Sequence, residues 1–247
     1  MKEFDKELAR RVFSCIDNTT LNGTDNEEHV ASFCRHTLEL GKVAAVCVYP
    51  RFVKVARNIL RSSDIKVASV AGAFPHGQLP IHLKVEEVKY AVGEGADEID
   101  MVLSRGALLA GEENRVRDEV AVMKEACQGK ILKVILETGE LPSPTLIEKA
   151  SQLAIDGGAD FIKTSTGKIG VGATLEAAET MLSVIAQNVK KSVKKVGFKA
   201  AGGISTPEEA MAYAELAKKI LGDDYVNNQT FRIGASRLTD RLYSILT

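Results

Sequence analysis

The segment Phe161-Ile162-Lys163-Thr164-Ser165-Thr166 is a short run of apolar and β-branched residues, a composition typical of a buried strand. Similar runs recur at intervals of roughly 30 residues, the length of a strand plus its crossover helix. The runs cover residues 13–16, 43–49, 66–74, 98–103, 131–138, 161–166, 197–203 and 231–236. Eight strands that alternate with helices predict an all-parallel α/β fold, and the count of eight favours a closed (β/α)8 TIM barrel.

The segments between these runs carry helix signals. Thr206-Pro207-Glu208-Glu209 combines an N-cap, a proline at the first helical position and a capping-box glutamate. Thr24-Asp25-Asn26-Glu27 predicts a second capping box. Residues 2–12 predict an extra N-terminal helix. Helical spacing of apolar residues defines one face in each of two further helices: Leu146, Ala150, Leu153 and Ala154, and Leu175, Ala178, Leu182, Ile185 and Val189.

The length of 247 residues allows either two domains or one large barrel. No linker or low-complexity segment divides the chain, so we expect a single domain over residues 1–247. The alternative fold is an open doubly wound sheet. That fold usually carries G-x-G-x-x-G after its first strand, where this chain has Asp17-Asn18-Thr19-Thr20. The barrel is therefore favoured.

Bulk composition argues against several classes of protein. Hydrophobic residues make up 45% of the chain, charged residues 26%, and the net charge is −1, which gives no sign of a nucleic-acid-binding face. Four scattered cysteines form no C-x-x-C pair and predict reduced thiols and a cytoplasmic location. The polar N-terminus does not fit a signal peptide, and no apolar run reaches the ~18 residues of a membrane helix.

Two lysines lie inside predicted strands, Lys163 in the sixth and Lys199 in the seventh. Neither face of a strand in a closed barrel is solvated, and a buried ammonium is costly unless it is paired or loses its proton. Two neighbouring lysines disfavour each other's charge, so one of them can become a neutral amine that attacks carbonyls. Schiff-base chemistry is the first hypothesis, with Asp100 of the fourth strand as a third buried charge.

Other polar residues gather at the carboxyl ends of the strands, where barrel enzymes hold their active sites. Asp17 either belongs to the site or caps the following turn. Lys133 either belongs to the site or is a structural partner of Asp100 or Glu137. Glu137 could be satisfied by neighbouring backbone or by a lysine. The four histidines form no H-x-H or H-E-x-x-H set, so we expect no metal site.

Glycine-rich turns follow the sixth, seventh and eighth strands. They are Gly167, Gly202-Gly203-Ile204-Ser205 and Gly234-Ala235-Ser236. Glycine lets backbone N–H groups approach a ligand closely, and barrel phosphate sites commonly lie after strands seven and eight. Lys168 and Arg237 add positive charge nearby. These features predict a phosphate site, although any one such turn is also compatible with a simple tight loop.

The ordered series of motifs from about Asp17 to Ser236 resembles the deoxyribose-phosphate aldolases, a family of class I aldolases. The segments that carry the resemblance are Asp17-Asn18-Thr19-Thr20-Leu21, Cys47-Val48-Tyr49-Pro50, Phe74-Pro75-His76-Gly77, Asp97-Glu98-Ile99-Asp100, Leu132-Lys133-Val134-Ile135-Leu136-Glu137-Thr138-Gly139, Phe161-Ile162-Lys163-Thr164-Ser165-Thr166-Gly167 and Lys199-Ala200-Ala201-Gly202-Gly203. The resemblance implies cleavage of 2-deoxy-D-ribose 5-phosphate to D-glyceraldehyde 3-phosphate and acetaldehyde, in deoxyribonucleotide catabolism. It also implies that no cofactor is needed and that the protein is a homo-oligomer, with a dimer favoured.

The resemblance also implies roles for single residues. Lys163 matches the Schiff-base lysine, Lys199 the second lysine that lowers the pKa of the first, and Asp100 the carboxylate of the proton relay. Asp17 and Lys133 match residues that contact substrate hydroxyls or the relay water. The expected phosphate-binding and substrate-binding residues are Thr166, Gly167, Lys168, Gly202, Gly203, Gly234, Ala235 and Ser236. Arg237 departs from the pattern, because many relatives have a serine there.

Three other functions remain open from the residues alone. The same fold could carry a metal-dependent aldolase or a phosphosugar isomerase. It could also be a sugar-phosphate binding or regulatory protein without catalysis. The set Asp100, Lys163 and Lys199 argues against a pure binding protein, which has no need of paired lysines and a relay acid.

Overall fold

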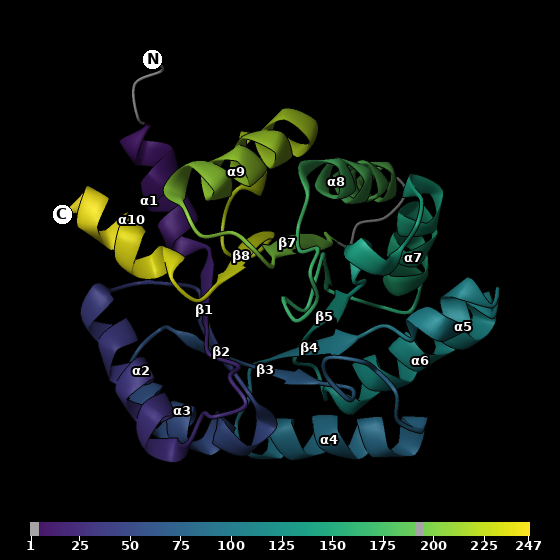
Figure 1. Cartoon of the computed structure of the whole chain (residues 1–247), viewed down its shortest axis with the longest axis horizontal. Coiled ribbons are helices and arrows are strands. Elements are labelled where there is room, and N and C mark those ends of the chain that lie inside the picture. Colours follow the sequence, from purple (N-terminus) through teal and green to yellow (C-terminus); the bar gives the residue numbers. More distant parts are fainter. Residues whose placement is uncertain (1–4, 191–194) are drawn as a thin grey trace.

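The computed structural model describes residues 5–190 and 195–247 of the chain. Its centre is a closed barrel of parallel strands in the order β1 to β8, with β8 returning to pair with β1 (Figure 1). The strands are β1 Ile16–Thr19, β2 Ala45–Val48, β3 Lys66–Ala71, β4 Glu98–Val102, β5 Ile131–Ile135, β6 Phe161–Lys163, β7 Gly197–Ala201 and β8 Phe231–Ala235. The predicted (β/α)8 TIM barrel is confirmed, and the open sheet is wrong.

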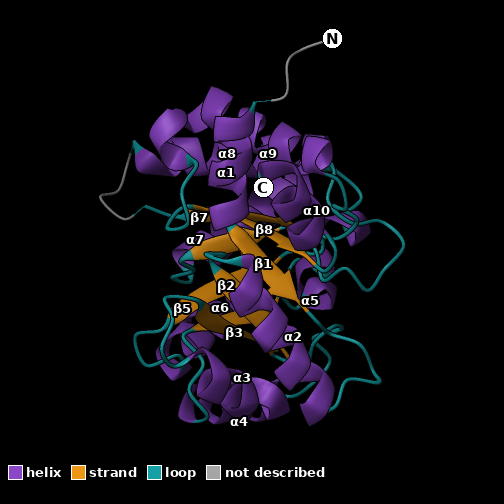
Figure 2. Ribbon diagram, turned by 90° about the vertical axis from the view of Figure 1, so that its left-hand side faces the viewer, coloured by secondary structure: helices purple, strands orange, loops and turns teal. Residues whose placement is uncertain are grey.

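The helices form a ring around the strands, which Figure 2 shows from the side. They are α1 Lys6–Ser14, α2 Glu27–Leu40, α3 Val53–Leu60, α4 Ile81–Gly93, α5 Arg105–Leu109, α6 Glu113–Ala126, α7 Pro144–Asp156, α8 Leu175–Val189, α9 Pro207–Leu221 and α10 Leu238–Leu246. Short 3-10 turns cover Pro50–Phe52, Thr138–Glu140 and Asp223–Tyr225. No helix within the described ranges is both long and apolar enough to cross a membrane.

The extra N-terminal helix is confirmed, with different bounds. It runs over Lys6–Ser14 and packs against α9 and α10. Residues 2–4 of the predicted helix lie outside the described residues. The first predicted strand, 13–16, is misplaced, because Phe13 belongs to this helix and the strand begins at Ile16.

The two predicted capping boxes have different outcomes. At α9 the box is complete: the Thr206 hydroxyl accepts from the backbone N of Glu209 (3.2 Å), and the Glu209 carboxylate accepts from the backbone N of Thr206 (3.0 Å). The box at Thr24 is wrong, because α2 is capped by Asn26, which accepts from the backbone N of His29. Asp25 instead accepts from the Thr20 hydroxyl and closes a turn ahead of the helix.

The two predicted apolar faces are buried in their middle parts. In α8, Ala178, Leu182 and Ile185 are buried, whereas Leu175 and Val189 at the helix ends are exposed. In α7, Ala150 and Ala154 are buried and Leu146 and Leu153 are partly buried. These faces pack the helices onto the outer surface of the barrel.

The interior of the barrel is divided between apolar and charged side chains. Small apolar residues of β2 and β3 form one cluster inside, which is Ala45, Cys47, Ala68 and Val70, together with Leu21. Each of the other strands carries at least one charged residue at an inward position. Side chains alternate between the two faces of a strand, so Glu98 and Asp100 of β4 point to the same side. The register also aligns Lys163 with Lys199, and Lys199 with Arg232.

Candidate active site

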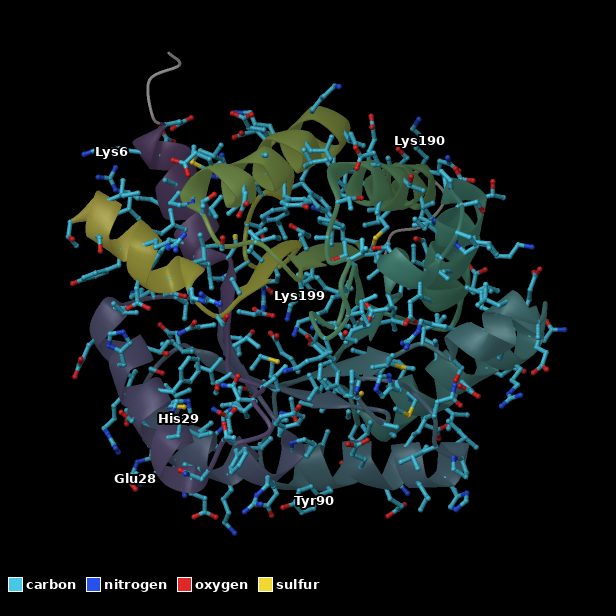
Figure 3. The ribbon with its side chains drawn as sticks, viewed as in Figure 1. Lys6, Glu28, His29, Tyr90, Lys190 and Lys199 are labelled. Atoms are coloured by element: carbon cyan, nitrogen blue, oxygen red, sulfur yellow. The ribbon has the colours of Figure 1, made fainter. Side chains whose placement is uncertain are left out.

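Seven charged side chains from six strands meet inside the barrel, and we call them the charged cluster. All are at most 4% exposed. The members are Asp17 of β1, Glu98 and Asp100 of β4, Lys133 of β5, Lys163 of β6, Lys199 of β7 and Arg232 of β8. Figure 3 places Lys199 inside the ring of helices, whereas Lys6 and Glu28 lie at the periphery.

Asp100 is the centre of the cluster, because three lysines share its carboxylate. Lys133 Nζ donates to Oδ1 (2.7 Å), while Lys163 Nζ (2.8 Å) and Lys199 Nζ (2.7 Å) both donate to Oδ2. The structure therefore brings together the three residues that the sequence singled out. Lys133 also bonds directly to Asp100, as its predicted structural alternative requires.

Asp17 and Glu98 are the other two carboxylates of the cluster. Asp17 Oδ2 accepts from Lys199 Nζ (2.5 Å) and its Oδ1 from Arg232 Nη1 (2.6 Å). Glu98 accepts from Lys133 Nζ (2.6 Å) and, with both oxygens, from Arg232. Asp17 is thus held inside the barrel by Lys199 and Arg232, with Lys133 3.4 Å away, and it does not cap the turn that follows β1.

The composition of the cluster leaves one positive charge in excess. It holds three carboxylates and four basic groups, and a buried uncompensated charge is expensive. Arginine does not release its proton in proteins. Lys133 lies within 3.4 Å of three carboxylates and Lys199 contacts two, whereas Lys163 has only a share of Asp100. Charge balance is therefore reached most easily if Lys163 is the neutral amine.

The pKa shifts have the same direction. Burial lowers the pKa of Lys163 below its ordinary value, Asp100 opposes this, and Lys199 adds to the lowering. Burial also acts on Lys199, but there Asp100 and Asp17 outweigh it and raise the pKa. The repulsion between the two lysines expected from the sequence contributes, but burial is the larger cause.

The two aspartates of the cluster remain ionised at neutral pH, because the pKa of each is lowered. Burial acts to raise the pKa of Asp17, but Lys199, Lys133 and Arg232 outweigh it and hold the pKa below its usual range. The pKa of Asp100 is likewise lowered, because Lys133, Lys163 and Lys199 outweigh burial. Burial raises the pKa of the nearby Cys47 thiol, so this side chain stays uncharged.

A cavity of about 440 Å³ opens above the cluster, at the carboxyl ends of β6, β7, β8 and β1. Lys163 is the member of the charged cluster that lines it. Asp17, Lys133, Asp100 and Lys199 lie beneath and are completely buried. A ligand in the cavity would therefore meet the Lys163 amine first, with the rest of the cluster behind it.

The predicted phosphate-binding loops form the wall of this cavity. Its lining residues include 166–168, 201–205 and 234–237, so Thr166, Gly167, Lys168, Gly202, Gly203, Gly234, Ala235 and Ser236 are brought together. Gly202 has a φ of 91°, and a Cβ there would lie 3.1 Å from the Cα of Gly172. Such a left-handed, crowded position requires glycine.

Gly234 is needed for another reason than the sequence suggested. Its φ is not in the left-handed region, and a Cβ would lie 3.0 Å from Cε of Lys199. The missing side chain therefore leaves room for the Lys199 stem. Besides lining the cavity, Gly234 allows Lys199 to reach Asp17 and Asp100.

Three cationic side chains surround the outer part of the cavity: Lys168, Arg237 and Arg241. Lys168 donates through Nζ to the carbonyl of Leu21 across the mouth, and Arg241 donates to the carbonyl of Ser205 (3.0 Å). Arg237 is exposed and forms no salt bridge within residues 5–190 and 195–247. Arg237 directly precedes α10 and Arg241 lies within it, and both line the cavity.

Glu137 is a buried residue whose hydrogen bonds support this wall of the cavity. It is fully buried with a left-handed φ of 56°, and it accepts from both the hydroxyl (2.5 Å) and the backbone N (3.2 Å) of Thr166. The Thr166 hydroxyl accepts in turn from the backbone N of Lys168 (3.0 Å). Glu137 thus fixes the loop after β6 that carries Gly167 and Lys168.

Sequence reasoning missed Arg232 and Arg241 and did not single out Glu98. Arg232 lies between Phe231 and Ile233 in an apolar strand. The criterion that identified Lys163, a basic residue inside an apolar strand, could therefore have identified Arg232 as well. Within the described residues, no group of three or more His, Cys, Asp or Glu side chains is arranged to hold a metal ion.

Comparison with known proteins identifies the family. A family model described as DeoC/LacD family aldolase matches residues 11–237. The chain belongs to the DeoC/LacD family of aldolases. It is therefore an aldolase, a lyase of the aldehyde-lyase type, and its cavity lies where (β/α)8 barrel enzymes carry their active sites.

Solved structures of DeoC-type aldolases cover nearly the whole chain. A protein from Coccidioides immitis assigned as a deoxyribose-phosphate aldolase is 29% identical over 96% of this chain and 86% of its own, with a TM-score of 0.82. A structure described as an aldolase is 33% identical over 95% of this chain and 96% of its own (TM-score 0.79). The tetrameric deoxyribose phosphate aldolase from Aeropyrum pernix is 25% identical over 98% of this chain and 97% of its own (TM-score 0.75).

Proposed function

We propose that this aldolase cleaves 2-deoxy-D-ribose 5-phosphate to D-glyceraldehyde 3-phosphate and acetaldehyde through a Schiff base on Lys163, a reaction of deoxyribonucleotide catabolism. The observation that carries the proposal is the position of Lys163. It is the lysine of the cluster with the fewest carboxylate contacts, and it lines the cavity. A neutral amine exposed to a ligand cavity is the group that an imine-forming aldolase needs.

The size and charge of the cavity support a phosphosugar substrate. Its inner end carries the Lys163 amine, and its outer end carries Lys168, Arg237 and Arg241 with the glycine turns. A sugar whose carbonyl lies at Lys163 would direct a terminal phosphate toward these cations and backbone N–H groups. The substrate is therefore held at both ends, which fixes the bond to be cleaved between them.

In the direction of synthesis, the Lys163 amine attacks the carbonyl carbon of acetaldehyde, and loss of water gives an iminium. Asp100 and Lys199, acting through a water, remove a methyl proton and leave an enamine. The enamine carbon attacks the aldehyde of glyceraldehyde 3-phosphate, and the relay protonates the new alkoxide. Hydrolysis of the imine releases Lys163 and the product. The iminium serves as the electron sink for carbon–carbon bond formation.

Chemical trapping tests this proposal. Acetaldehyde with borohydride should add an ethyl group to the protein, found by mass spectrometry on the peptide that contains Lys163. Chelation with EDTA should leave both trapping and cleavage of deoxyribose 5-phosphate unchanged, whereas a metal-dependent aldolase would lose activity. A label on another lysine, or the absence of any label, would contradict the assignment.

Arg237 should act on the phosphate and not on the chemistry. We expect Arg237→Ser to raise KM for deoxyribose 5-phosphate about tenfold, the effect of one charge-assisted hydrogen bond of roughly 1.5 kcal/mol. The kcat/KM for unphosphorylated deoxyribose should not change. Steady-state kinetics on both substrates checks this, with Arg115→Ser, an exposed arginine of α6, as the matched control. An equal loss on both substrates would show that Arg237 does not meet the phosphate.

A further inference from the structure

Arg232 is the basic member of the charged cluster that has no role in the proposed reaction. Its Nη1 donates to Asp17 (2.6 Å) and to Glu98 (3.0 Å), its Nη2 to Glu98 (2.7 Å), and its Nε to the carbonyl of Asn228 (2.6 Å). The guanidinium also lies over the ring of Phe161, 5.5 Å from the centroid. It is 2% exposed and is not among the residues lining the cavity, so it does not reach a substrate.

The contacts of Arg232 determine which carboxylates remain for the lysines. It bonds one oxygen of Asp17 and both oxygens of Glu98. The titratable and charged groups that face Lys163 and Arg232 from the strands packed around them are Asp17 of β1, Cys47 of β2, Glu98 and Asp100 of β4, Lys133 of β5 and Lys199 of β7. Cys15, the residue that ends α1, also lies close to Arg232. Of the four basic residues in the cluster, Arg232 is the one that keeps its charge at every accessible pH, because an arginine side chain does not lose its proton.

We propose that Arg232 is a positioning residue whose fixed charge, spread over Asp17 and Glu98, completes the balance of three cations against three carboxylates and so leaves the Lys163 amine free to be neutral. The inference rests on the proposed function, in which Lys163 is the nucleophile. Arg232 would then act on catalysis through the protonation state of Lys163, without touching the substrate.

Removing the charge of Arg232 should reverse this balance. Three carboxylates would then face Lys133 and Lys199 alone, and the buried excess of negative charge would draw a proton. Lys163 already donates to Asp100 and is the basic group left to accept that proton. A protonated Lys163 is not nucleophilic, so imine formation would require a higher pH. Removing the charge of Glu98 should act in the opposite direction.

The experiment measures the pH dependence of adduct formation on Lys163, with acetaldehyde and borohydride as the probe. Arg232→Met should move the midpoint of the rate upward by about one pH unit or more, the scale on which a neighbouring charge acts. Arg232→Lys keeps the charge and should stay close to the parent protein. Glu98→Gln should move the midpoint downward, and the double variant Arg232→Met with Glu98→Gln should return toward the parent value.

These variants separate a charge effect from a loss of structure. A purely structural role would reduce the amount of active protein but leave the midpoint unchanged, and that result would overturn the inference. If Arg232→Met does not fold, Glu98→Gln decides: a downward shift supports the inference, and an unchanged or upward shift overturns it. Arg115→Met, an exposed arginine outside the site, is the control for charge removal as such.

The failure of this inference can be distinguished from the failure of the proposed function. If the parent protein forms no adduct on Lys163, the Schiff-base proposal itself is wrong. If the parent forms the adduct but the midpoint does not respond to Arg232 or Glu98, only the role of Arg232 is wrong.

Discussion

Replacing Lys163 by Met or by Arg should abolish both the cleavage of deoxyribose 5-phosphate and the trapping of an adduct by borohydride. Lys163→Met and Lys163→Arg both lack the nucleophilic amine, so turnover should fall on the order of 10⁶-fold, the scale of nucleophile removal. Their thermal stabilities should differ, because the two replacements carry different charges.

Lys163→Met keeps the balance of three carboxylates against three cations, and it should melt at or above the temperature of the parent protein at neutral pH. Lys163→Arg makes the excess positive charge permanent, and it should lose about 3 kcal/mol, the lower range for an uncompensated buried charge. Calorimetry checks the order of the melting temperatures. The reverse order, with the Arg variant as stable as the parent protein and the Met variant destabilised, would mean that Lys163 is charged in the parent protein. Retained turnover would remove it from the mechanism.

Asp100→Asn should separate imine formation from proton transfer. The substitution removes the relay carboxylate but leaves the Lys163 amine, whose pKa should fall further without its carboxylate partner. Borohydride trapping should therefore continue, and its acidic limb should move to lower pH. Exchange of deuterium from solvent into the methyl group of acetaldehyde should fall by about 10²–10⁴-fold, the usual contribution of general acid–base catalysis.

The same variant should be unstable, because Lys133 and Lys199 lose a shared partner. A loss of about 3–5 kcal/mol is the range for breaking a buried ion pair. Glu113→Gln removes a carboxylate from an exposed pair with Lys149 and is the matched control, with little expected change. Exchange at the parental rate in Asp100→Asn would exclude this carboxylate from the relay.

The sequence predicted the number of strands well and their ends poorly. Predicted strands 66–74 and 131–138 overrun β3 and β5, because Ala73 and Glu137 adopt left-handed conformations that apolar patterning does not reveal. The first strand was misplaced because its inward residue is Asp17. A strand whose buried side faces a charged interior carries no apolar signal, whereas Phe13 in the preceding helix does.

For the site, too, some features could be predicted from the sequence and others could not. Lys163 and Lys199 could be found because a lysine in an apolar strand conflicts with local patterning. Their common partner Asp100 followed the same rule. The distribution of contacts could not be found, because it depends on the register between strands, which aligns Lys199 with Arg232 and Asp100 with Lys133. Only the arrangement of the strands shows that Lys163 contacts fewer carboxylates than Lys133 and Lys199 do.

The closure of β1 against β8 has a consequence for how the chain folds. Asp17 and Arg232 bond across a separation of 215 residues, and Glu98 reaches the same guanidinium from 134 residues away. Without β8, the three carboxylates face only the three lysines, so charge balance there requires Lys163 to be protonated as well. Ordering of the interior must therefore wait for the last strand, because contacts this distant in sequence carry a high entropic cost before they form. An intermediate that lacks β8 would hold Asp17 and Glu98 without their guanidinium partner, so hydration of its open interior would compete with collapse. The contacts of Arg232 with Asp17 and Glu98, which we propose keep Lys163 neutral, therefore also make the addition of the last strand a cooperative step in folding.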